Sequence, residues 1–142
     1  MTPQRITMIT LAVADMERSR RFYAALGWDE AAGGNEKITF YKIAGQFFAL
    51  YSKDELTKDL GLPIHARSTG TITLATNYNS PQDVDHAFAD AITAGAIAIT
   101  RPAKVFWGGY SGNFADPDGH LWEVAHNPFW TLDDSGQIVG DA

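Results

Sequence analysis

Apolar and polar residues alternate in two short segments that are nearly identical. The segment ITLAV at 9–13 recurs as ITLAT at 72–76, a shift of 63 positions. In each copy isoleucine and leucine fall on one side of an extended chain, and threonine and alanine fall on the other, as in a half-buried β-strand. The repeat predicts that the chain contains two copies of one module.

A helix is expected after each of these strands. Residues 15–27 and 80–95 carry apolar residues at helical spacing, which predicts that each helix packs one face onto a sheet. Asp15 and Ser80 stand where an N-cap is needed, and Gly95 supplies a stop after the second helix.

A second alignment joins the ends of the two modules. FYKIAGQFFALYS at 40–52 matches FADPDGHLWEVAH at 114–126 at a shift of 74, with Gly45 aligned to Gly119. Strand-like residues on both sides of a turn that contains glycine predict a β-hairpin in each module.

These patterns predict an α+β fold in which two βαβββ modules form a curved mixed sheet around a concave pocket, with the helices on the outside. The expected parts are a first module at 1–52, a linker at 53–69, a second module at 70–126 and a tail at 127–142, all within one structural unit, 1–142. The expected strands are 6–13, 28–32, 37–43 and 47–52, then 70–76, 97–100, 109–115 and 121–126. Ser52 and Glu55 have capping-box spacing, so the linker is expected to hold a short helix.

The repeat also predicts which side chains line the pocket. If the helices cover the isoleucine and leucine side of each first strand, the opposite side faces the pocket. The residues predicted there are Met8, Thr10, Ala12, Thr71, Thr73 and Ala75. On the last strand, alternation turns Trp122 and Val124 toward the helix and Glu123 into the pocket. A charge among apolar neighbours is costly unless it has a partner, which makes Glu123 a candidate functional residue.

Aromatic residues in VFWGGYSGNF, at 105–114, form a second candidate feature. Trp107 and Tyr110 offer flat surfaces that suit stacking on a ring or holding a cation. The alternative is that this loop plugs the mouth of the pocket, with Trp107 in the core. Farther along, Phe129 and Trp130 are expected to fix the start of the tail to the body.

Composition narrows the classes of partner. The formal net charge of -6 argues against nucleic acid and anionic membranes as partners, because both favour clustered lysine and arginine. There is no cysteine, which excludes disulfides and thiolate metal sites and is compatible with a cytoplasmic location. The N-terminal segment has no signal-peptide pattern and no apolar run is long enough to span a bilayer. We therefore expect a soluble cytoplasmic protein with a small-molecule ligand.

The paired modules, together with VADMERSRRFYAALGW early and FADPDGHLWEV late, resemble the vicinal oxygen chelate superfamily. This superfamily includes glyoxalase I, extradiol dioxygenases and the bleomycin-resistance proteins. The resemblance extends over roughly residues 4–127 and implies the fold, but not one reaction, because the superfamily supports several reactions and simple drug binding on one scaffold. It also implies a homodimer.

The resemblance implies metal-ligand positions on the first and last strand of each module. In this sequence these positions hold Met8, Ala49, Thr71 and Glu123. A thioether, a methyl group and a hydroxyl do not replace imidazole or carboxylate ligands, so we expect no metal and no other cofactor. A divalent metal at Glu123 remains the alternative, and it would need a further ligand such as His65 from the linker.

The leading hypothesis is therefore a metal-free protein that binds a small aromatic or cationic molecule. Glu123 would supply the polar contact, or act as a general base, and Trp107 and Tyr110 would supply a stacking surface. The alternatives are a lyase or isomerase of the glyoxalase class, a dioxygenase-like enzyme, and a scaffold whose pocket has no ligand. For Glu123 itself, the structural alternative is a carboxylate paired with a lysine or arginine.

Overall fold

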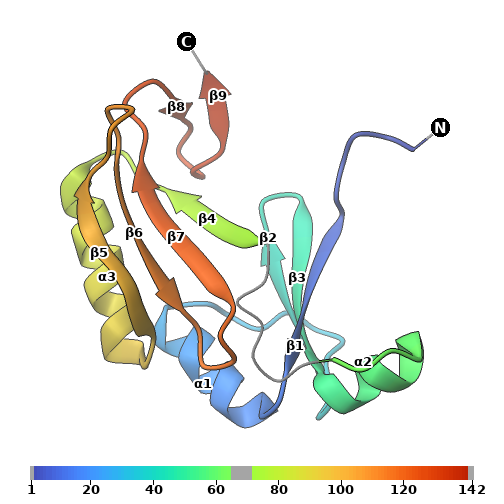
Figure 1. The fold of residues 1–142 in the computed structure, drawn as a ribbon. Coiled ribbons are helices and arrows are strands. Elements are labelled where there is room, and N and C mark those ends of the chain that lie inside the picture. Colours follow the sequence, from blue (N-terminus) through green and yellow to red (C-terminus); the bar gives the residue numbers. More distant parts are fainter. Residues whose placement is uncertain (1, 65–71, 141–142) are drawn as a thin grey trace. The chain divides into compact units, whose positions relative to one another are not determined.

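The computed structural model describes residues 2–64 and 72–140, and these form two compact units that divide between residues 67 and 68. The α+β class predicted from the repeat is confirmed, and both units follow the βαβββ plan, although one strand of the first unit is reduced to an isolated bridge (Figure 1). Each unit is described separately. No helix within the described residues has the length and apolarity needed to cross a membrane.

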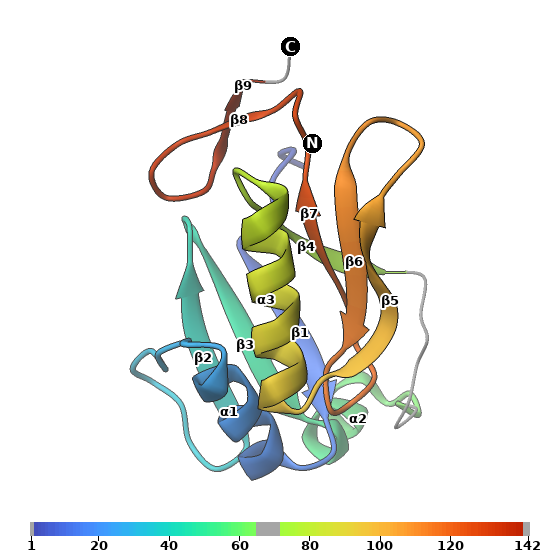
Figure 2. The ribbon, with the colours of Figure 1, turned by 90° about the vertical axis from the view of Figure 1, so that its left-hand side faces the viewer.

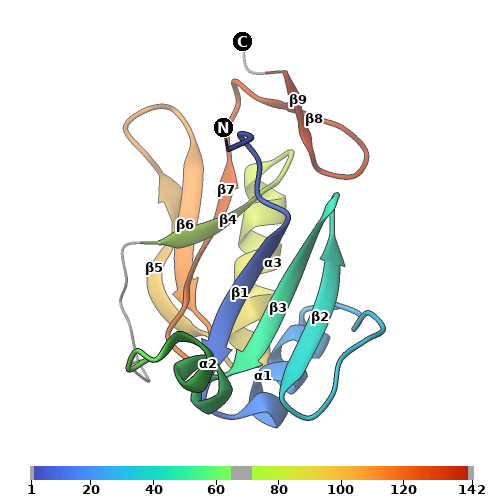
Figure 3. The same cartoon turned by 90° about the vertical axis from the view of Figure 1, so that its right-hand side faces the viewer.

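The first unit is built on a three-stranded sheet. Its elements are β1 (Met8–Val13), α1 (Met16–Ala25), β2 (Ile38–Ile43), β3 (Gln46–Ser52) and α2 (Lys53–Leu60). The strand order is β1-β3-β2, with β1 parallel and β2 antiparallel to β3 (Figure 3). The helix expected in the linker is α2, and the hydroxyl of Ser52 accepts a hydrogen bond from its first turn, as the capping pattern predicts.

Aromatic packing between α1 and this sheet forms the core of the first unit. Tyr23 from the helix lies 5.4 Å from Phe48 and 5.9 Å from Tyr41, measured between ring centroids. Trp28, which follows the helix, packs against the same three rings. The Asp15 carboxylate caps α1 by accepting a hydrogen bond from the backbone of its first turn, as predicted.

The expected strand at 28–32 is wrong, because only an isolated bridge between Glu30 and Tyr41 forms there. Arg20 instead holds this connection. Its guanidinium donates to the hydroxyl of Thr39 and to the backbone oxygen of Asn35, and it lies 3.6 Å from the Glu30 carboxylate. Contacts to one arginine thus accompany a single backbone bridge where a third ladder was expected.

The second unit is built on a four-stranded sheet with the order β4-β7-β6-β5. Its elements are β4 (Thr73–Asn77), α3 (Pro81–Ala94), β5 (Ile97–Lys104), β6 (Tyr110–Ala115) and β7 (Leu121–His126). β4 and β7 are parallel, and the other two pairs are antiparallel. Ser80 caps α3 and Gly95 ends it in a left-handed conformation, both as predicted.

The helix α3 covers one face of this sheet, over β5, β6 and β7 (Figure 2). Its buried residues Val84 and Phe88 meet a face that carries Phe114 and Trp122, whose rings stack at 6.4 Å. The expectation that the helix also covers Ile72 is wrong, because this side chain precedes β4 and is 72% exposed. Ile72 comes just before the start of the edge strand β4, and α3 does not cover it.

Two features of the second unit extend beyond the predicted pattern. β5 continues to Lys104 rather than ending at residue 100, with register shifts on either side of Thr100. The tail forms a small hairpin of β8 (Thr131–Leu132) and β9 (Ile138–Gly140), which Figure 1 shows beyond the ends of the larger strands. Asp133 closes its turn by accepting hydrogen bonds from two backbone amides.

Candidate functional site

The sheet of the second unit has two chemically different faces. Along β7, Trp122 and Val124 are buried on the α3 side, whereas Glu123 between them is half-buried and points the other way. This confirms the orientation predicted from alternation. We call the face turned away from α3 the open face. Its members on the four strands include Thr73, Ala75, Thr100, Ser111, Asn113, Leu121, Glu123 and Ala125.

A polar row crosses the open face at the level of Glu123. Strand register places Asn113 of β6 directly opposite Glu123, and Thr100 of β5 opposite Asn113. On the other side, Ala75 of β4 is opposite Glu123. The Thr100 hydroxyl donates a 2.7 Å hydrogen bond to the Oδ1 atom of Asn113. A carboxylate, an amide and a hydroxyl therefore lie side by side, next to a residue with only a methyl group.

The Glu123 carboxylate has no partner in this row. Among residues 2–64 and 72–140, no side chain or backbone amide forms a hydrogen bond or ion pair with it. The interpretation of Glu123 as half of a structural ion pair with lysine or arginine therefore finds no support in the described part of the chain. A half-buried carboxylate without a protein partner is available to a ligand that brings a cation or an N–H donor.

The predicted first-module residues share one face of their own sheet. Thr10 is opposite Ala49, and Met8 is opposite Phe47, on the side away from the core rings Tyr41 and Phe48. Met8 is 47% exposed, whereas Ala49 is fully buried. A methyl group that no solvent reaches offers a ligand little contact, so Met8 and Thr10 are the accessible members of this set.

In the second unit, Thr73 lies on the open face opposite Leu121 and is exposed. Thr71 and His65, the other residues predicted to approach the pocket, lie outside the described residues.

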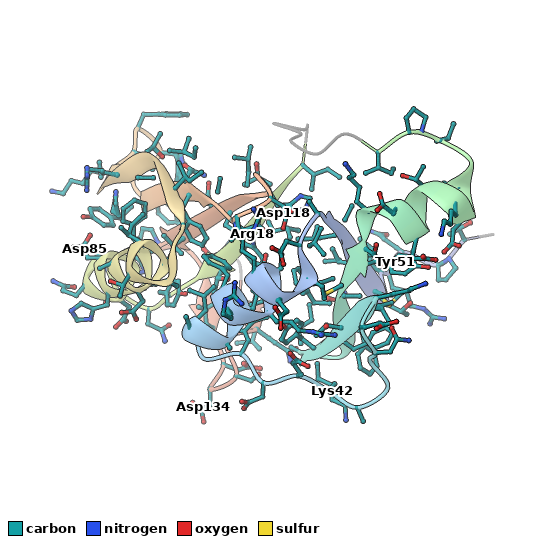
Figure 4. All side chains as sticks on the ribbon, turned by 90° about the horizontal axis from the view of Figure 1, so that it is seen from below. Arg18, Lys42, Tyr51, Asp85, Asp118 and Asp134 are labelled. Carbon is teal, nitrogen blue, oxygen red and sulfur yellow. The ribbon has the colours of Figure 1, made fainter. Side chains whose placement is uncertain are left out.

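Tyr110 does not share the face of Glu123. It alternates with Asn113 along β6 and is on the α3 side, where its hydroxyl donates a 2.7 Å hydrogen bond to Asp85. Figure 4 labels Asp85 on α3. This hydrogen bond raises the pKa of the Tyr110 phenol. The prediction that Tyr110 forms a stacking surface beside Glu123 is therefore wrong in its orientation. Tyr110 lies within the strand expected at 109–115, but the prediction grouped it with the aromatic residues of 105–114 and did not apply strand alternation to it.

Trp107 lies in the turn that connects β5 and β6. Its indole packs over the backbone of Gly109 and remains 40% exposed, while the adjacent Phe106 is fully exposed. The ring of Phe129 approaches Gly108 in the same turn, although Phe129 is 57% exposed. The loop is thus an aromatic surface of its own at the end of the β5–β6 hairpin.

Asn113 and Thr100 are the site residues that the sequence-based prediction missed. The signal was present in the hairpin, because the turn at 116–119 sets the register of β6 against β7 and thereby places Asn113 opposite Glu123. The ordinary role expected for His126 is confirmed, since its Nδ1 atom lies 2.9 Å from the backbone oxygen of Tyr78.

The described residues do not fit zinc, nickel or iron. Of the four positions at which the sequence resemblance implies ligands, the three described ones present a thioether, a methyl group and one carboxylate. The neighbours of Glu123 add an amide and a hydroxyl, and no group of three histidine, aspartate or glutamate side chains converges within the described residues. Zinc, nickel and iron prefer nitrogen, sulfur and carboxylate donors in such sites.

The chain is similar to known proteins in sequence family and in fold. The model of the Glyoxalase/Bleomycin resistance protein/Dioxygenase superfamily matches residues 5–124. The structure of a glyoxalase-related enzyme from Fulvimarina pelagi superposes with a TM-score of 0.91 and 33% identity, covering 99% of this chain and 100% of that one. The comparison with curated proteins found no match.

More distant structures share the fold. A glyoxalase/bleomycin resistance protein/dioxygenase from Nocardioides is 24% identical, with a TM-score of 0.75 over 89% of this chain and 85% of that one. Lactoylglutathione lyase from Agrobacterium tumefaciens is 20% identical, with a TM-score of 0.69 over 93% of this chain and 100% of that one. At this identity the likeness concerns the fold alone.

Proposed function

The chain belongs to the Glyoxalase/Bleomycin resistance protein/Dioxygenase superfamily, and within it we propose that this protein binds a small organic cation at Glu123 without a metal. The family scaffold supports several chemistries, so the proposal depends on the residues of the site. The observation that carries it is the half-buried Glu123 carboxylate, which has no hydrogen-bond or ion-pair partner among the described residues.

The surroundings of Glu123 suit an organic ligand. Leu121 and Ala75 on the same face offer apolar contact to a carbon skeleton, and the small Ala75 side chain leaves the carboxylate accessible from one side. A hydrogen bond to a charged group contributes about 1.5–3 kcal/mol, which is enough to favour a cation over a neutral ligand of the same shape by roughly tenfold or more.

Enzyme activity of the glyoxalase class is a second candidate. It is favoured by the 33% identity to a structure described as a glyoxalase-related enzyme. In that function Glu123 would act as a general base that takes a proton from the substrate, since it is the carboxylate of the open face. Ring cleavage by a dioxygenase is less well supported, because the three described ligand positions do not fit a metal.

Three probes that share one ring test the leading proposal. Benzylammonium, benzyl alcohol and benzoate carry a positive, a neutral and a negative group, and isothermal titration calorimetry at neutral pH gives their affinities. We expect benzylammonium to bind best, and Glu123→Gln to abolish its advantage over benzyl alcohol. Asp90→Asn is the matched control, because it removes one exposed carboxylate from α3, on the other side of the sheet.

Metal analysis tests whether the protein is free of metal, as the leading proposal requires. We expect purified protein to contain no stoichiometric zinc, nickel, manganese or iron, and EDTA to leave benzylammonium affinity unchanged. A stoichiometric metal that is lost in Glu123→Gln would overturn the proposal. The homodimer and the cytoplasmic location stay predictions, and light scattering coupled to gel filtration tests the first.

A further inference from the structure

We propose that Asn113 is a second ligand-binding residue, and that the ligand carries an ammonium group and an oxygen acceptor on adjacent carbons. This inference rests on the proposed function, because it takes Glu123 as the group that binds the cation. It adds a named donor beside the carboxylate and a chemical class for the ligand, namely vicinal amino alcohols and α-amino carbonyl compounds.

The side-chain amide of Asn113 is oriented by Thr100. The Thr100 hydroxyl donates to Oδ1 of Asn113 at 2.7 Å, so the oxygen branch of the amide is engaged on the β5 side. The nitrogen branch points away from that contact, and no hydrogen bond from it reaches any residue in the described ranges. A primary amide nitrogen carries two donors, so Asn113 has donors available on a half-buried surface.

The register brings these donors to the carboxylate. Asn113 and Glu123 are directly opposite on antiparallel strands, and side chains in such a pair have Cβ atoms about 4.5–5.5 Å apart. The Glu123 carboxylate as acceptor and the Asn113 amide as donor, at this spacing, match a ligand that carries its ammonium donor and its oxygen acceptor on adjacent carbons. Ala75, on the far side of Glu123, adds no competing polar group.

Phenylglycinol and α-methylbenzylammonium form a matched pair of probes, because they differ only in one hydroxyl group next to the ammonium carbon. We expect wild-type protein to bind phenylglycinol up to about tenfold more tightly, as one added hydrogen bond allows. Asn113→Leu should bring this ratio close to one. Thr100→Val, which leaves Asn113 in place but removes the group that orients it, should reduce the ratio in part.

The two residues give separable results. Glu123→Gln should lose the preference for ammonium over benzyl alcohol but keep a preference for the hydroxyl-bearing probe, whereas Asn113→Leu should do the reverse. Equal binding of phenylglycinol and α-methylbenzylammonium by wild type overturns the inference while the proposed function stands on the ammonium preference. The inference is also overturned if folded Asn113→Leu keeps the wild-type ratio of phenylglycinol to α-methylbenzylammonium affinity. If the leucine variant does not fold, an unchanged ratio in Thr100→Val overturns it. Failure of all ammonium probes to bind wild type removes the proposed function and this inference with it.

Discussion

Replacing Tyr41 by phenylalanine should stabilise the protein. Tyr41 lies on β2 and is 2% exposed, and its ring packs against Tyr23, Trp28 and Phe48. Its hydroxyl is buried and has no hydrogen-bond partner in the described part of the chain. Phenylalanine keeps the ring and removes only the unpaired polar atom.

The magnitude follows from the cost of an unpaired hydroxyl. A buried polar group without a partner costs about 1–3 kcal/mol of stability. Some of this gain is lost, because the oxygen also makes van der Waals contacts that phenylalanine lacks. We therefore expect Tyr41→Phe to raise the free energy of unfolding by about 1 kcal/mol at neutral pH, with a Tm increase of roughly 4 °C.

Alkaline pH should enlarge the difference between the two proteins. Burial raises the pKa of Tyr41 from 10.0 to about 12. The pKa of Tyr41 is higher in the folded protein than in the unfolded chain, so the folded state disfavours the ionised phenol. Stability is therefore unaffected by this ionisation below pH 10 and falls as the pH rises to about 12. A rise of this size corresponds to a loss of about 3 kcal/mol in wild type. Tyr41→Phe should not show this loss.

Urea unfolding between neutral and alkaline pH measures both effects. Tyr51→Phe is the control, because the Tyr51 hydroxyl donates a 2.7 Å hydrogen bond to Asp59 and its removal should bring no gain. Lower stability of Tyr41→Phe at neutral pH would refute the reasoning. So would an equal gain in Tyr51→Phe, since the effect would then not depend on the missing partner.

Three further changes test local features of the second unit. Gly112→Ala should cost about 1–3 kcal/mol in urea unfolding, because the added Cβ would lie 2.8 Å from the backbone nitrogen of Pro102; unchanged stability would contradict this packing. Ser80→Ala should lower the free energy of unfolding by about 1 kcal/mol, because the α3 cap is lost. A urea midpoint equal to that of wild type, followed by circular dichroism, would argue against this role. Hydrogen bonds from the backbone of Gln137 and from Ser135 lower the pKa of Asp133. The support that Asp133 gives to the tail hairpin is therefore present above its ordinary pKa near 4 and lost as the pH falls through the lower folded value, so amide shifts of residues 131–140 should change only in strong acid.

The sequence alone was sufficient to predict the features that repeat. The two copies of the first strand and the two hairpins identified the βαβββ modules, and alternation along β7 gave the correct orientation of Glu123. These features could be predicted because each depends on local spacing and on one buried face. The caps at Asp15 and Ser80 were found for the same reason.

The predictions that failed concern features that depend on contacts between distant segments. Residues 28–32 form only an isolated bridge, and Arg20 holds that connection from the helix, a contact that no local pattern encodes. Tyr110 was misplaced because its face was inferred from its aromatic character, whereas alternation along β6 turns it toward Asp85 of α3. Asn113 was overlooked because an amide has chemical meaning here only through its register with Glu123.

The most direct test of the central claim is to map the bound cation on the sheet by NMR. Benzylammonium is titrated into uniformly ¹⁵N-labelled protein, and amide and Asn side-chain shifts are followed. The account predicts that the largest changes occur at Ala75, Asn113 and Glu123, and that they disappear in Glu123→Gln. Changes that are confined to the aromatic turn around Trp107, or that persist unchanged in Glu123→Gln, would contradict it.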